Sequence, residues 1–496
     1  MPGKLKPFCC ASYSFKMHLT AGGLEKKTEP ATMAAESKKG QVTGMGLIVF
    51  VLLAGLEIAL AVRTCTKDKE KKAHRKNRLI VRAVQLAIVG IAMLLPAGQK
   101  WRFVPVLGFL ALLLVIAALG FVFKRKKEDG LKKPAGVVLS CLLCVLFLGL
   151  LLAPAFLFTG YRGLPVTGEH PIGETSAILI DRSRTDPFES DGSFREVPVH
   201  FYYPAVTAEG EHFPLVVFSH GAFGYYQSNT STYMELASKG YVVAALDHPH
   251  HAFFTEDTDG KLVTVDTDFI NTALNLNSLT DKQKEYALYR DWMALRTADM
   301  NFAVDAIKTA AQTGTPDESW FISDKDAKML QTALRMTDVS KIGLMGHSMG
   351  GATSVQLGRE RSDISAVIDL DGTMLGEYQG VENGELLVSD APYTVPVLDF
   401  NNWESYIDIK EYRAQGFRYP NAEVIDHAAA GFSTTIRDTK HMDFTDLPLL
   451  SPFLGNMLGS GERSTEETMT IVNTLVLQFY DCYLKGEGAF TVQDTY

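Results

Sequence analysis

The chain has 496 residues, of which 46% are hydrophobic and 21% charged, with six cysteines and a net charge of −9. This length is too great for one ordinary domain of about 100–200 residues. Residues 1–159 carry 24 Lys and Arg against 8 Asp and Glu, whereas residues 160–496 carry 24 against 49. The split indicates two environments, and we expect no nucleic-acid partner for the acidic part. That part has a single cysteine, Cys482, which excludes an internal disulfide.

Four apolar runs follow an N-terminal tail of residues 1–43. Each run is close to the roughly 20 residues that an α-helix needs to cross a bilayer. Their repetition and length exclude a cleaved signal peptide. The sequence therefore predicts a four-helix transmembrane region over residues 44–158, with spans at Gly44–Val62, Leu79–Ala97, Phe103–Phe123 and Ala135–Phe158.

The loops between the runs predict the orientation in the membrane. Arg63–Arg78 holds eight basic and two acidic residues, and Lys124–Lys133 holds six basic and two acidic. Positively charged loops stay in the cytoplasm, so these two loops are expected there. With an even number of spans, both ends of the chain lie on the opposite side. We expect a multi-pass protein of the cell membrane with an exported C-terminal domain. An exported domain with one cysteine fits a bacterial envelope better than an animal extracellular space.

The predicted spans contain a few polar side chains. Glu57 of the first span lies about one turn from the cytoplasmic end, and Arg82 and Gln85 lie at a similar depth in the second. A charge in the membrane suggests function by default, but its depth here favours a structural pair over transport chemistry. Cys141 and Cys144 form a C-x-x-C inside an apolar run, where helix packing is a better interpretation than a redox motif.

A Gly- and Pro-rich segment, residues 159–175, reads as a linker, and a different pattern starts at residue 176. Short apolar strands now alternate with helices such as Tyr233–Lys239 and Tyr286–Ala311. This alternation is typical of a mostly parallel sheet covered on both faces, so residues 176–496 are predicted to form one α/β domain. The predicted strands are Pro198–Ala205, Pro214–Gly221, Gly240–His248, Lys341–Gly346, Ser365–Gly372 and Val395–Asn402.

Ser348 lies in "GHSMGG", between the strand "KIGLMG" and a helix that starts just after the serine. Gly346 and Gly350 allow a tight strand-to-helix turn, and the small Gly351 keeps helix and strand close. The amides and the dipole at the N-terminus of the helix then lie beside the hydroxyl. This context predicts a nucleophilic serine in an α/β-hydrolase fold.

A serine hydroxyl needs a base to take its proton and an acid to orient that base. In α/β-hydrolases the chain order is serine, acid, histidine. Two histidines follow Ser348: His441, after the strand-like "GFSTTIRD", is favoured over His427, which reads as structural. For the acid, the pattern gives Asp371 only a slight edge over Asp399, because both end predicted strands; Asp369 lies inside its strand.

The oxyanion of the reaction needs two preorganised donors, commonly backbone amides. One is expected at Met349, directly after the nucleophile. The other is expected in the turn "SHGAFG" after the strand "PLVVFSHG", with Ala222 as the donor. His220 precedes the serine in the chain and is expected to brace this turn rather than act as the base.

Two segments are expected near the substrate. The loop "DHPHH" (Asp247–His251) has no helical i, i+4 spacing, so a pocket-lining loop is favoured over a zinc site. The segment Phe253–Tyr286 lies between a strand and a helix, and is either part of a lid or a plain surface insertion. No metal or cofactor is predicted, and the expected pocket residues are Phe223, His248, Phe253 and Phe254.

Several motifs of the domain resemble one family. "PLVVFSHGAFG…ELASKGYVVAALDH", "GHSMGG", "IDLDGTM", "KHMDFTDL" and the upstream "DRSRTDPF…REVPVHFYYPA" are similar to the plasma-type (group VII) platelet-activating factor acetylhydrolases. The resemblance covers roughly residues 178–450 and does not reach the spans. It implies a calcium-independent serine esterase of the α/β-hydrolase fold, here as a membrane-anchored relative of bacterial type. The implied substrates are glycerophospholipids with a short or oxidised sn-2 acyl chain.

By this match, Ser348, Asp371 and His441 fall on the family's triad, and Ala222 and Met349 on its oxyanion amides. The family takes its acid from the strand after the nucleophile helix, which lifts Asp371 above Asp399. Two positions depart from the family: the residue after the nucleophile is Met rather than Phe, and "LDGTM" stands for "LDxWM". Both changes bear on acyl-chain preference.

We therefore expect a membrane-anchored serine carboxylic ester hydrolase that acts on short or modified acyl esters of lipids. One alternative is an acyltransferase or esterase of a cell-envelope polymer. Another is a membrane sensor or interaction module that carries an inactive hydrolase domain. The complete set of serine, histidine and oxyanion turn argues against an inactive domain.

Overall fold

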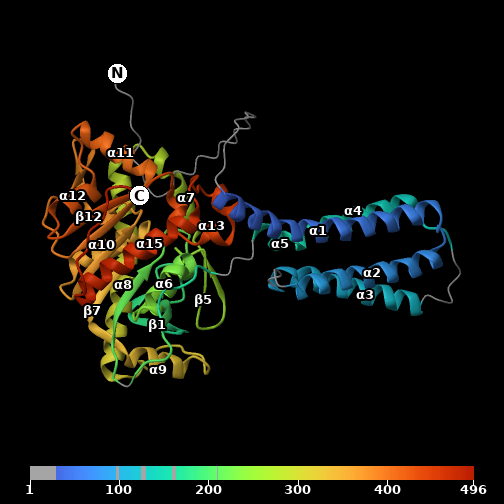
Figure 1. Ribbon diagram of the computed structural model, residues 1–496, viewed down its shortest axis with the longest axis horizontal. Helices are drawn as coiled ribbons and strands as arrows, with labels where there is room; N and C mark the ends of the chain where they lie inside the picture. Colours follow the sequence, from blue (N-terminus) through green and yellow to red (C-terminus); the bar gives the residue numbers. More distant parts are fainter. Residues whose placement is uncertain (1–29, 96–99, 124–129, 159–162, 209) are drawn as a thin grey trace. The chain divides into compact units, whose positions relative to one another are not determined.

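The structure, a computed structural model, describes residues 30–95, 100–123, 130–158, 163–208 and 210–496, with backbone alone for residues 30–44. These residues form two compact units (Figure 1). The helical unit contains the described residues up to 158 together with Leu449–Leu454, and the α/β unit contains Gly163–Pro448 and Gly455–Tyr496. Most of the predicted tail, with Cys9 and Cys10, lies outside the described residues. So do Ala97, most of the second basic loop and residues 159–162 of the predicted linker.

Four helices of the helical unit are long and apolar enough to cross a membrane, over Met45–Thr66, Lys71–Leu94, Lys100–Phe123 and Pro134–Leu151. They overlap the four predicted spans, and the second begins eight residues earlier than predicted. The elements of this unit are α1 (Pro30–Thr66), α2 (Lys71–Leu94), η1 (Lys100–Phe103), α3 (Val104–Phe123), α4 (Pro134–Leu151) and α5 (Ala153–Leu157).

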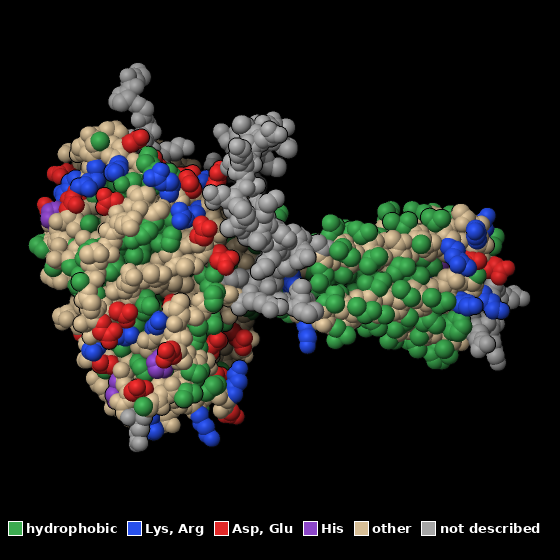
Figure 2. Space-filling view, in the orientation of Figure 1, with side chains coloured by type: hydrophobic (Ala, Val, Ile, Leu, Met, Phe, Trp, Pro, Cys, Tyr) green, Lys and Arg blue, Asp and Glu red, His purple; other side chains and the backbone are tan. Residues whose placement is uncertain are grey.

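The exposed surface of these helices is largely hydrophobic. Figure 2 shows hydrophobic side chains along the unit and most of its Lys and Arg side chains at one end. An extended apolar surface of this kind is typical of helices in contact with lipid. Exposed large side chains include Leu47, Val51, Ile91, Leu112, Leu142 and Leu146.

A buried polar cluster joins three of the helices. The guanidinium of Arg82 on α2 forms an ion pair with Glu57 on α1, in which Nη2 lies 3.1 Å from Oε2. Gln85 donates to the same carboxylate at 2.8 Å and to the carbonyl oxygen of Leu53 at 3.1 Å. Arg82 also lies 3.7 Å from the sulfur of Cys144 on α4. The predicted pairing is confirmed, and these mutual contacts fit a role in helix packing.

An eight-stranded sheet forms the centre of the α/β unit, in the order β1-β2-β4-β3-β7-β8-β11-β12. The β1–β2 and β2–β4 pairs are antiparallel, and every later pair is parallel. The predicted mostly parallel α/β-hydrolase sheet is confirmed. Its strands are β1 (Ile172–Thr185), β2 (Phe194–Pro204), β3 (Phe213–Ser219), β4 (Val242–Leu246), β7 (Thr337–His347), β8 (Ile364–Leu370), β11 (Val397–Asn402) and β12 (Gly431–Ile436). Two hairpins lie outside it, β5 (Phe254–Glu256) with β6 (Leu262–Thr264), and β9 (Tyr378–Glu382) with β10 (Glu385–Val388).

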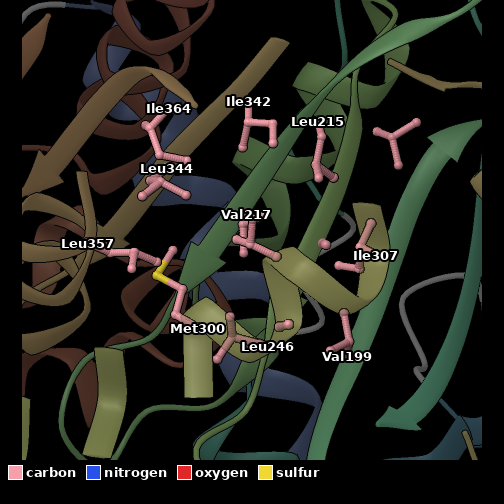
Figure 3. Close-up of a cluster of buried hydrophobic side chains, with 14 of the residues drawn as sticks. Val199, Leu215, Val217, Leu246, Met300, Ile307, Ile342, Leu344, Leu357 and Ile364 are labelled. Atoms are coloured by element: carbon pink, nitrogen blue, oxygen red, sulfur yellow. The ribbon is translucent and has the colours of Figure 1, made fainter. Parts of the chain in front are cut away.

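The two faces of the sheet are covered by different helices. Successive residues of a strand point to opposite faces, so on β3 Leu215 and Val217 pack on one side while Val216 and Phe218 pack on the other. Figure 3 shows the first side, where Met300 and Ile307 of α8 meet strand residues such as Val217. α8, α9 and α12 pack on this side, and α6 and α15 on the opposite side.

The other helical segments lie between the strands or, from η5 on, follow the last strand. They are η2 (Tyr226–Asn229), α6 (Thr230–Ser238), α7 (Thr267–Asn275), η3 (Leu276–Ser278), α8 (Lys282–Thr313), α9 (Ala327–Arg335), α10 (Met349–Glu360), η4 (Leu375–Glu377), α11 (Trp403–Ala414), α12 (Pro420–His427), η5 (His441–Phe444), α13 (Leu447–Leu450), α14 (Pro452–Met457), α15 (Thr465–Tyr480) and η6 (Asp481–Lys485).

The end of the predicted linker is part of the α/β unit. The backbone N–H of Thr167 donates to Glu235 of α6 at 2.8 Å, and its hydroxyl donates to the same carboxylate at 2.5 Å. The N–H of Gly168 donates to the Ser238 hydroxyl at 3.1 Å. A Cβ at Gly168 would lie 1.9 Å from the Ser238 carbonyl oxygen, which explains the glycine. The α/β unit therefore starts before residue 176, and β1 takes up the last four residues of the segment predicted as linker.

Candidate active site

Ser348 lies in the turn between β7 and α10, with φ 57° and ψ −125°. A positive φ at a residue with a side chain is strained and is held only by its surroundings. A Cβ at Gly346 would lie 2.1 Å from the carbonyl oxygen of Gly350, and one at Gly350 would lie 1.9 Å from that of Ser219. Both distances are far below any real Cβ contact. The two glycines of the motif are thus required by close backbone approach.

Two further turns lie beside Ser348. Its backbone N–H donates to the carbonyl oxygen of Leu370 at 2.9 Å, at the end of β8. A Cβ at Gly372, in the turn after β8, would lie 2.3 Å from the Ser348 carbonyl oxygen, and one at Gly221, after β3, would lie 3.1 Å from the Ser348 Cβ. The carboxyl ends of β3, β7 and β8 therefore meet at the serine.

Asp371 follows β8 with φ 58° and faces His441, which follows β12. The His441 Nδ1 atom lies 2.6 Å from Oδ2 of the Asp371 carboxylate. Asn402, at the end of β11, donates to the same carboxylate through its backbone N–H, at 2.6 Å from Oδ1. Its side-chain Nδ2 donates to Oδ1 at 3.0 Å and to Oδ2 at 2.9 Å. These donors fix the carboxylate and direct it at the imidazole.

The loop that carries His441 is held from both sides. Asp443 accepts hydrogen bonds from the backbone N–H groups of Lys440 at 2.9 Å and Gly461 at 2.6 Å. The His347 ring, next to Ser348 in the chain, lies 4.6 Å from the His441 ring, and its Nε2 donates to the His441 carbonyl oxygen at 3.2 Å. Burial, and then the neighbouring His441, hold the pKa of His347 well below its usual value. His441 thus lies beside the serine turn with about a third of its side chain exposed.

The other candidates for acid and base lie elsewhere. Asp399 accepts hydrogen bonds from Asn401 at 2.7 Å and Asn421 at 3.0 Å rather than from His441. Burial, with a smaller contribution from the charge of Asp371, raises the pKa of Asp399 to about 6. Asp369 is fully buried and accepts a backbone N–H of the next turn. His427 ends α12, where its Nδ1 bonds a carbonyl of its own helix. The geometry therefore favours Asp371 and His441.

The two predicted oxyanion amides belong to one neighbourhood. Ala222 and Phe223 pack against a buried cluster that contains Met349. The N–H of Phe223 is already engaged, since it donates to the His251 carbonyl oxygen at 3.1 Å. Within the described part of the chain, no hydrogen bond uses the N–H of Ala222 or Met349. These two donors remain available to an oxyanion.

A second serine–histidine–aspartate set lies inside the domain. His248 Nε2 lies 2.8 Å from the Ser219 hydroxyl, and its Nδ1 lies 3.1 Å from Oδ2 of Asp299. All three side chains are fully buried, and Asp299 also accepts two hydrogen bonds from the buried Arg195. Burial lowers the pKa of His248 to about 4, so this ring is neutral. A side chain without exposed surface does not line a pocket, so the prediction for His248 is corrected: it is a buried packing residue.

The remaining polar side chains of the loop 247–251 point to separate partners. Asp247 accepts the backbone N–H of Tyr226 at 2.7 Å, and burial raises its pKa to about 8. The ring of His250 stacks on Phe188 at 4.4 Å, whereas His251 stacks on an aromatic ring of α7 at 3.8 Å. Packing contacts therefore account for these side chains.

The predicted aromatic pocket residues differ in exposure. Phe223 is half-buried and packs on Phe269 with ring centroids 5.2 Å apart. Phe253 and Phe254 lie at the start of the β5–β6 hairpin and are 59% and 41% exposed. The N–H of Phe253 donates to the carbonyl oxygen of Gly224 at 2.8 Å, which ties the hairpin to the turn after β3. The segment predicted as a lid or insertion is thus this hairpin followed by α7.

Sequence reasoning missed three residues that support the site. Asn402 stands in the strand "VLDFNN", and its position at the end of the strand next to β8 was a usable signal. Asp443 lies two residues after His441, where a carboxylate that caps a turn is a common device. Arg296 of α8 donates to the carbonyl oxygens of His220 at 2.5 Å and Gly221 at 3.3 Å, in the turn after β3, and nothing in the helical pattern distinguishes it from a surface arginine.

Comparisons with known proteins identify the family of the chain. Residues 192–495 match the family described as platelet-activating factor acetylhydrolase, isoform II. The chain belongs to this family. Platelet-activating factor acetylhydrolases of Cavia porcellus and Bos taurus are 25% identical over 295 residues and 27% over 292 residues, and each alignment covers 58% of this chain.

The chain spans only about 60% of the length of these relatives: 61% of the Cavia porcellus protein and 60% of the Bos taurus protein. The platelet-activating factor acetylhydrolase of Gallus gallus is 25% identical over 303 residues, with 65% of its length covered. Among solved structures, a ferulic acid esterase from Streptomyces cinnamoneus aligns with a TM-score of 0.46 at 21% identity, over 66% of this chain and 93% of that one.

Proposed function

We propose that the protein is a membrane-anchored serine carboxylic ester hydrolase that cleaves short or modified acyl esters of lipids. The observation that carries the proposal is the 2.6 Å contact between His441 and Asp371 beside the strained turn of Ser348. Ser348 is the proposed nucleophile, His441 the base and Asp371 the acid. The order of these residues in the chain is that of α/β-hydrolases.

In the proposed mechanism, His441 takes the hydroxyl proton of Ser348 while Oγ attacks the ester carbonyl carbon. The electron pair of the C=O bond moves to oxygen, and the N–H groups of Ala222 and Met349 stabilise the oxyanion. The intermediate expels the alcohol, which takes the proton from His441, and leaves an acyl-serine. His441 then deprotonates a water, which attacks the acyl carbon to form a second tetrahedral intermediate. The bond from the acyl carbon to Oγ breaks, Ser348 takes the proton back from His441, and the carboxylic acid is released. Asp371 holds the imidazole in the required tautomer throughout.

The substrate class rests on the family and on the surroundings of the site. The relatives are named platelet-activating factor acetylhydrolases, which supports an ester of a short acyl chain on a lipid. The exposed Phe253 and Phe254 are proposed to contact the acyl chain, because their hairpin is tied to the oxyanion turn.

The four apolar helices are proposed to anchor the protein in the cell membrane, with the catalytic domain on the extracytoplasmic side. The basic residues between the first and second spans support this orientation. A protease added to intact cells should then remove the domain and leave the helical unit protected. A domain that resists the protease until the cells are opened would contradict the orientation without affecting the proposed chemistry.

Labelling with a fluorophosphonate probe tests the nucleophile. We expect the full chain in phospholipid nanodiscs to be labelled once per chain and Ser348→Ala not to be labelled. The matched control is Ser219→Ala, because Ser219 belongs to the other serine–histidine–aspartate set and is fully buried. The control should keep its labelling. An unlabelled full chain, or label retained by Ser348→Ala, would refute the proposed function.

A further inference from the structure

We propose that Arg296 is a positioning residue for ester hydrolysis: it fixes and polarises the Gly221–Ala222 peptide so that the Ala222 N–H points at the oxyanion. The inference rests on the proposed function. Arg296 lies on α8, distant in sequence from the turn after β3, and would join the proposed triad and oxyanion amides as a residue on which ester hydrolysis depends.

Arg296 is fully buried and meets the turn after β3 with both terminal nitrogens of its guanidinium group. Its Nη1 donates to the carbonyl oxygen of His220 at 2.5 Å, and its Nη2 donates to that of Gly221 at 3.3 Å. Its Nε donates to Nδ1 of His251 at 3.3 Å. A planar fork of donors holds two carbonyls in one orientation, which a single ammonium group does not.

The Gly221 carbonyl is the other end of the proposed donor. In a trans peptide the C=O of one residue and the N–H of the next belong to one rigid plane and point in opposite directions. A cation at the Gly221 oxygen therefore turns the Ala222 N–H away from Arg296. The Cβ built on Gly221 lies 3.1 Å from the Ser348 Cβ, so this peptide lies next to the nucleophile.

His220 supplies a second donor to the same oxygen. The backbone N–H of His248 donates to His220 Nε2 at 3.1 Å, so this nitrogen carries no proton. The proton of the neutral ring is then on Nδ1, which donates to the Gly221 carbonyl oxygen at 2.7 Å. Burial, and then the charge of Arg296, hold the pKa of His220 well below its usual value, in agreement with a neutral ring.

The Gly221 oxygen thus accepts from a cation, from an imidazole and, at 3.1 Å, from the backbone N–H of Gly224. Hydrogen bonds that share a peptide group strengthen one another, so acceptance at the oxygen makes the N–H a better donor. The N–H of Phe223 is excluded as the alternative donor because it bonds the carbonyl oxygen of His251. Arg296 bonds the ring of that same histidine, so one side chain supports both sides of the turn.

Arg296→Lys tests the inference, because lysine keeps the charge and loses the fork. The full chain in nanodiscs is assayed with 4-nitrophenyl acetate, and the affinity for an aryl trifluoromethyl ketone, which forms a tetrahedral oxyanion adduct with serine, is measured. Loss of a whole oxyanion donor costs about 100- to 1,000-fold in kcat, so a weakened donor should cost about tenfold. We expect KM to stay within about twofold and the ketone affinity to fall by the same factor as kcat.

Arg195→Lys is the matched control. Arg195 is equally buried but bonds Asp186, Asp299 and the Pro249 carbonyl oxygen instead of the turn. The Arg195→Lys variant should have a lower thermal midpoint but should not show the parallel loss of kcat and ketone affinity. An equal loss in Arg195→Lys, or unchanged kcat and ketone affinity in Arg296→Lys, would overturn the inference.

His220→Gln provides a second test if Arg296→Lys does not fold. It removes the Nδ1 donor from the Gly221 oxygen and should give the same joint fall in kcat and ketone affinity, whereas unchanged values would overturn the inference. Failure of this inference is distinct from failure of the proposed function. If Ser348 alone accounts for fluorophosphonate labelling while the Arg296 and His220 variants keep full kcat, only the role of Arg296 is refuted.

Discussion

The imidazole of His441 and the carboxylate of Asp371 are joined at 2.6 Å although the residues lie seventy positions apart in the chain. β8 ends just before the aspartate and β12 a few residues before the histidine, and one parallel strand lies between them in the sheet. The carboxyl ends of parallel strands share one edge of a sheet, which is where α/β folds place their sites. The pair therefore follows from strand order rather than from closeness in sequence.

Asp371→Asn should almost abolish ester hydrolysis while the domain remains folded. The amide no longer stabilises the imidazolium and favours the wrong tautomer of His441, and such a change costs about 10,000-fold in kcat in a serine protease. The measurement is kcat with 4-nitrophenyl acetate. The control is Asp399→Asn: at a raised pKa of about 6 this buried carboxyl readily takes a proton, and the amide resembles that neutral form. A greater loss in Asp399→Asn would refute the assignment of the acid.

Asn402 offers a pair of variants that separate two roles. Its side chain donates to Asp371, and its Oδ1 also accepts the N–H of Ser405 at 2.9 Å as the N-cap of α11. Asn402→Ala removes both interactions and should cost about 1 kcal/mol in stability for the lost cap. Asn402→Asp keeps the cap but places a second carboxylate against Asp371.

We therefore expect Asn402→Asp to lower kcat more than Asn402→Ala does, by about tenfold or more, because like charges within a few ångströms repel strongly in a buried site. Activity and thermal midpoint are measured on both variants. If the loss of activity simply follows the loss of stability, Asn402 is only a helix cap.

Gly350→Ala should prevent folding of the α/β unit. The added Cβ would lie 1.9 Å from the carbonyl oxygen of Ser219, which is backbone of a central strand and has no room to move. Overlaps of this kind belong to the rare substitutions that cost more than about 4 kcal/mol. Gly380→Ala is the control, because nothing lies within 4 Å of a Cβ built there. The yield of folded chain and the thermal midpoint distinguish them, and a stable Gly350→Ala would mean that helix and strand separate easily.

Asp446 should make the stability of the α/β unit depend on pH. Its carboxylate accepts from the N–H of Ser231 at 2.6 Å and from its hydroxyl at 2.5 Å, yet burial outweighs these bonds and raises its pKa from 3.8 to about 6. Between about pH 4 and 6 the folded chain keeps a proton that the unfolded chain has lost. This group's contribution to stability is therefore largest below about pH 4, falls as pH rises to about 6, and stays low above that.

Asp446→Asn imitates the protonated form at every pH. Relative to the unmodified chain, the thermal midpoint of Asp446→Asn should be similar near pH 4 and higher above pH 6. The corresponding gain in the free energy of unfolding above pH 6 is on the order of 2–3 kcal/mol at most. Asp191→Asn should show the opposite sign, because hydrogen bonds from Ser193 lower the pKa of Asp191. A gain for Asp446→Asn that is the same at both pH values would contradict the proposed linkage.

Local patterns were sufficient to predict the parallel strands at the centre of the sheet, the four apolar helices and the strand-to-helix turn of Ser348, but not the edge strand β1. Continuous apolar strands and the spacing of glycines around the serine are properties of residues that are neighbours in the chain, so a short stretch of sequence is enough to predict them. The choice between Asp371 and Asp399 is different, because both end strands and only the resemblance separated them. The structure brings Asp371 to His441 and surrounds Asp399 with asparagines.

Non-local contacts account for what the sequence did not reveal. His248 was predicted to line a pocket because it follows a central strand, but Ser219 and Asp299 occupy its two nitrogens inside the core. Residues 167–168 read as linker because Gly and Pro surround them, yet their partners Glu235 and Ser238 lie on α6, about 70 positions away. Burial and distant partners of this kind leave no trace in local composition.

The close approach of Gly346 and Gly350 has a consequence for the entropy of positioning the proposed nucleophile. Because strand and helix lock the serine in its strained form, the entropy of arranging the nucleophile is lost once, when the domain folds, and not in each cycle. The proposed nucleophile therefore needs no rearrangement of its own turn before it attacks an ester.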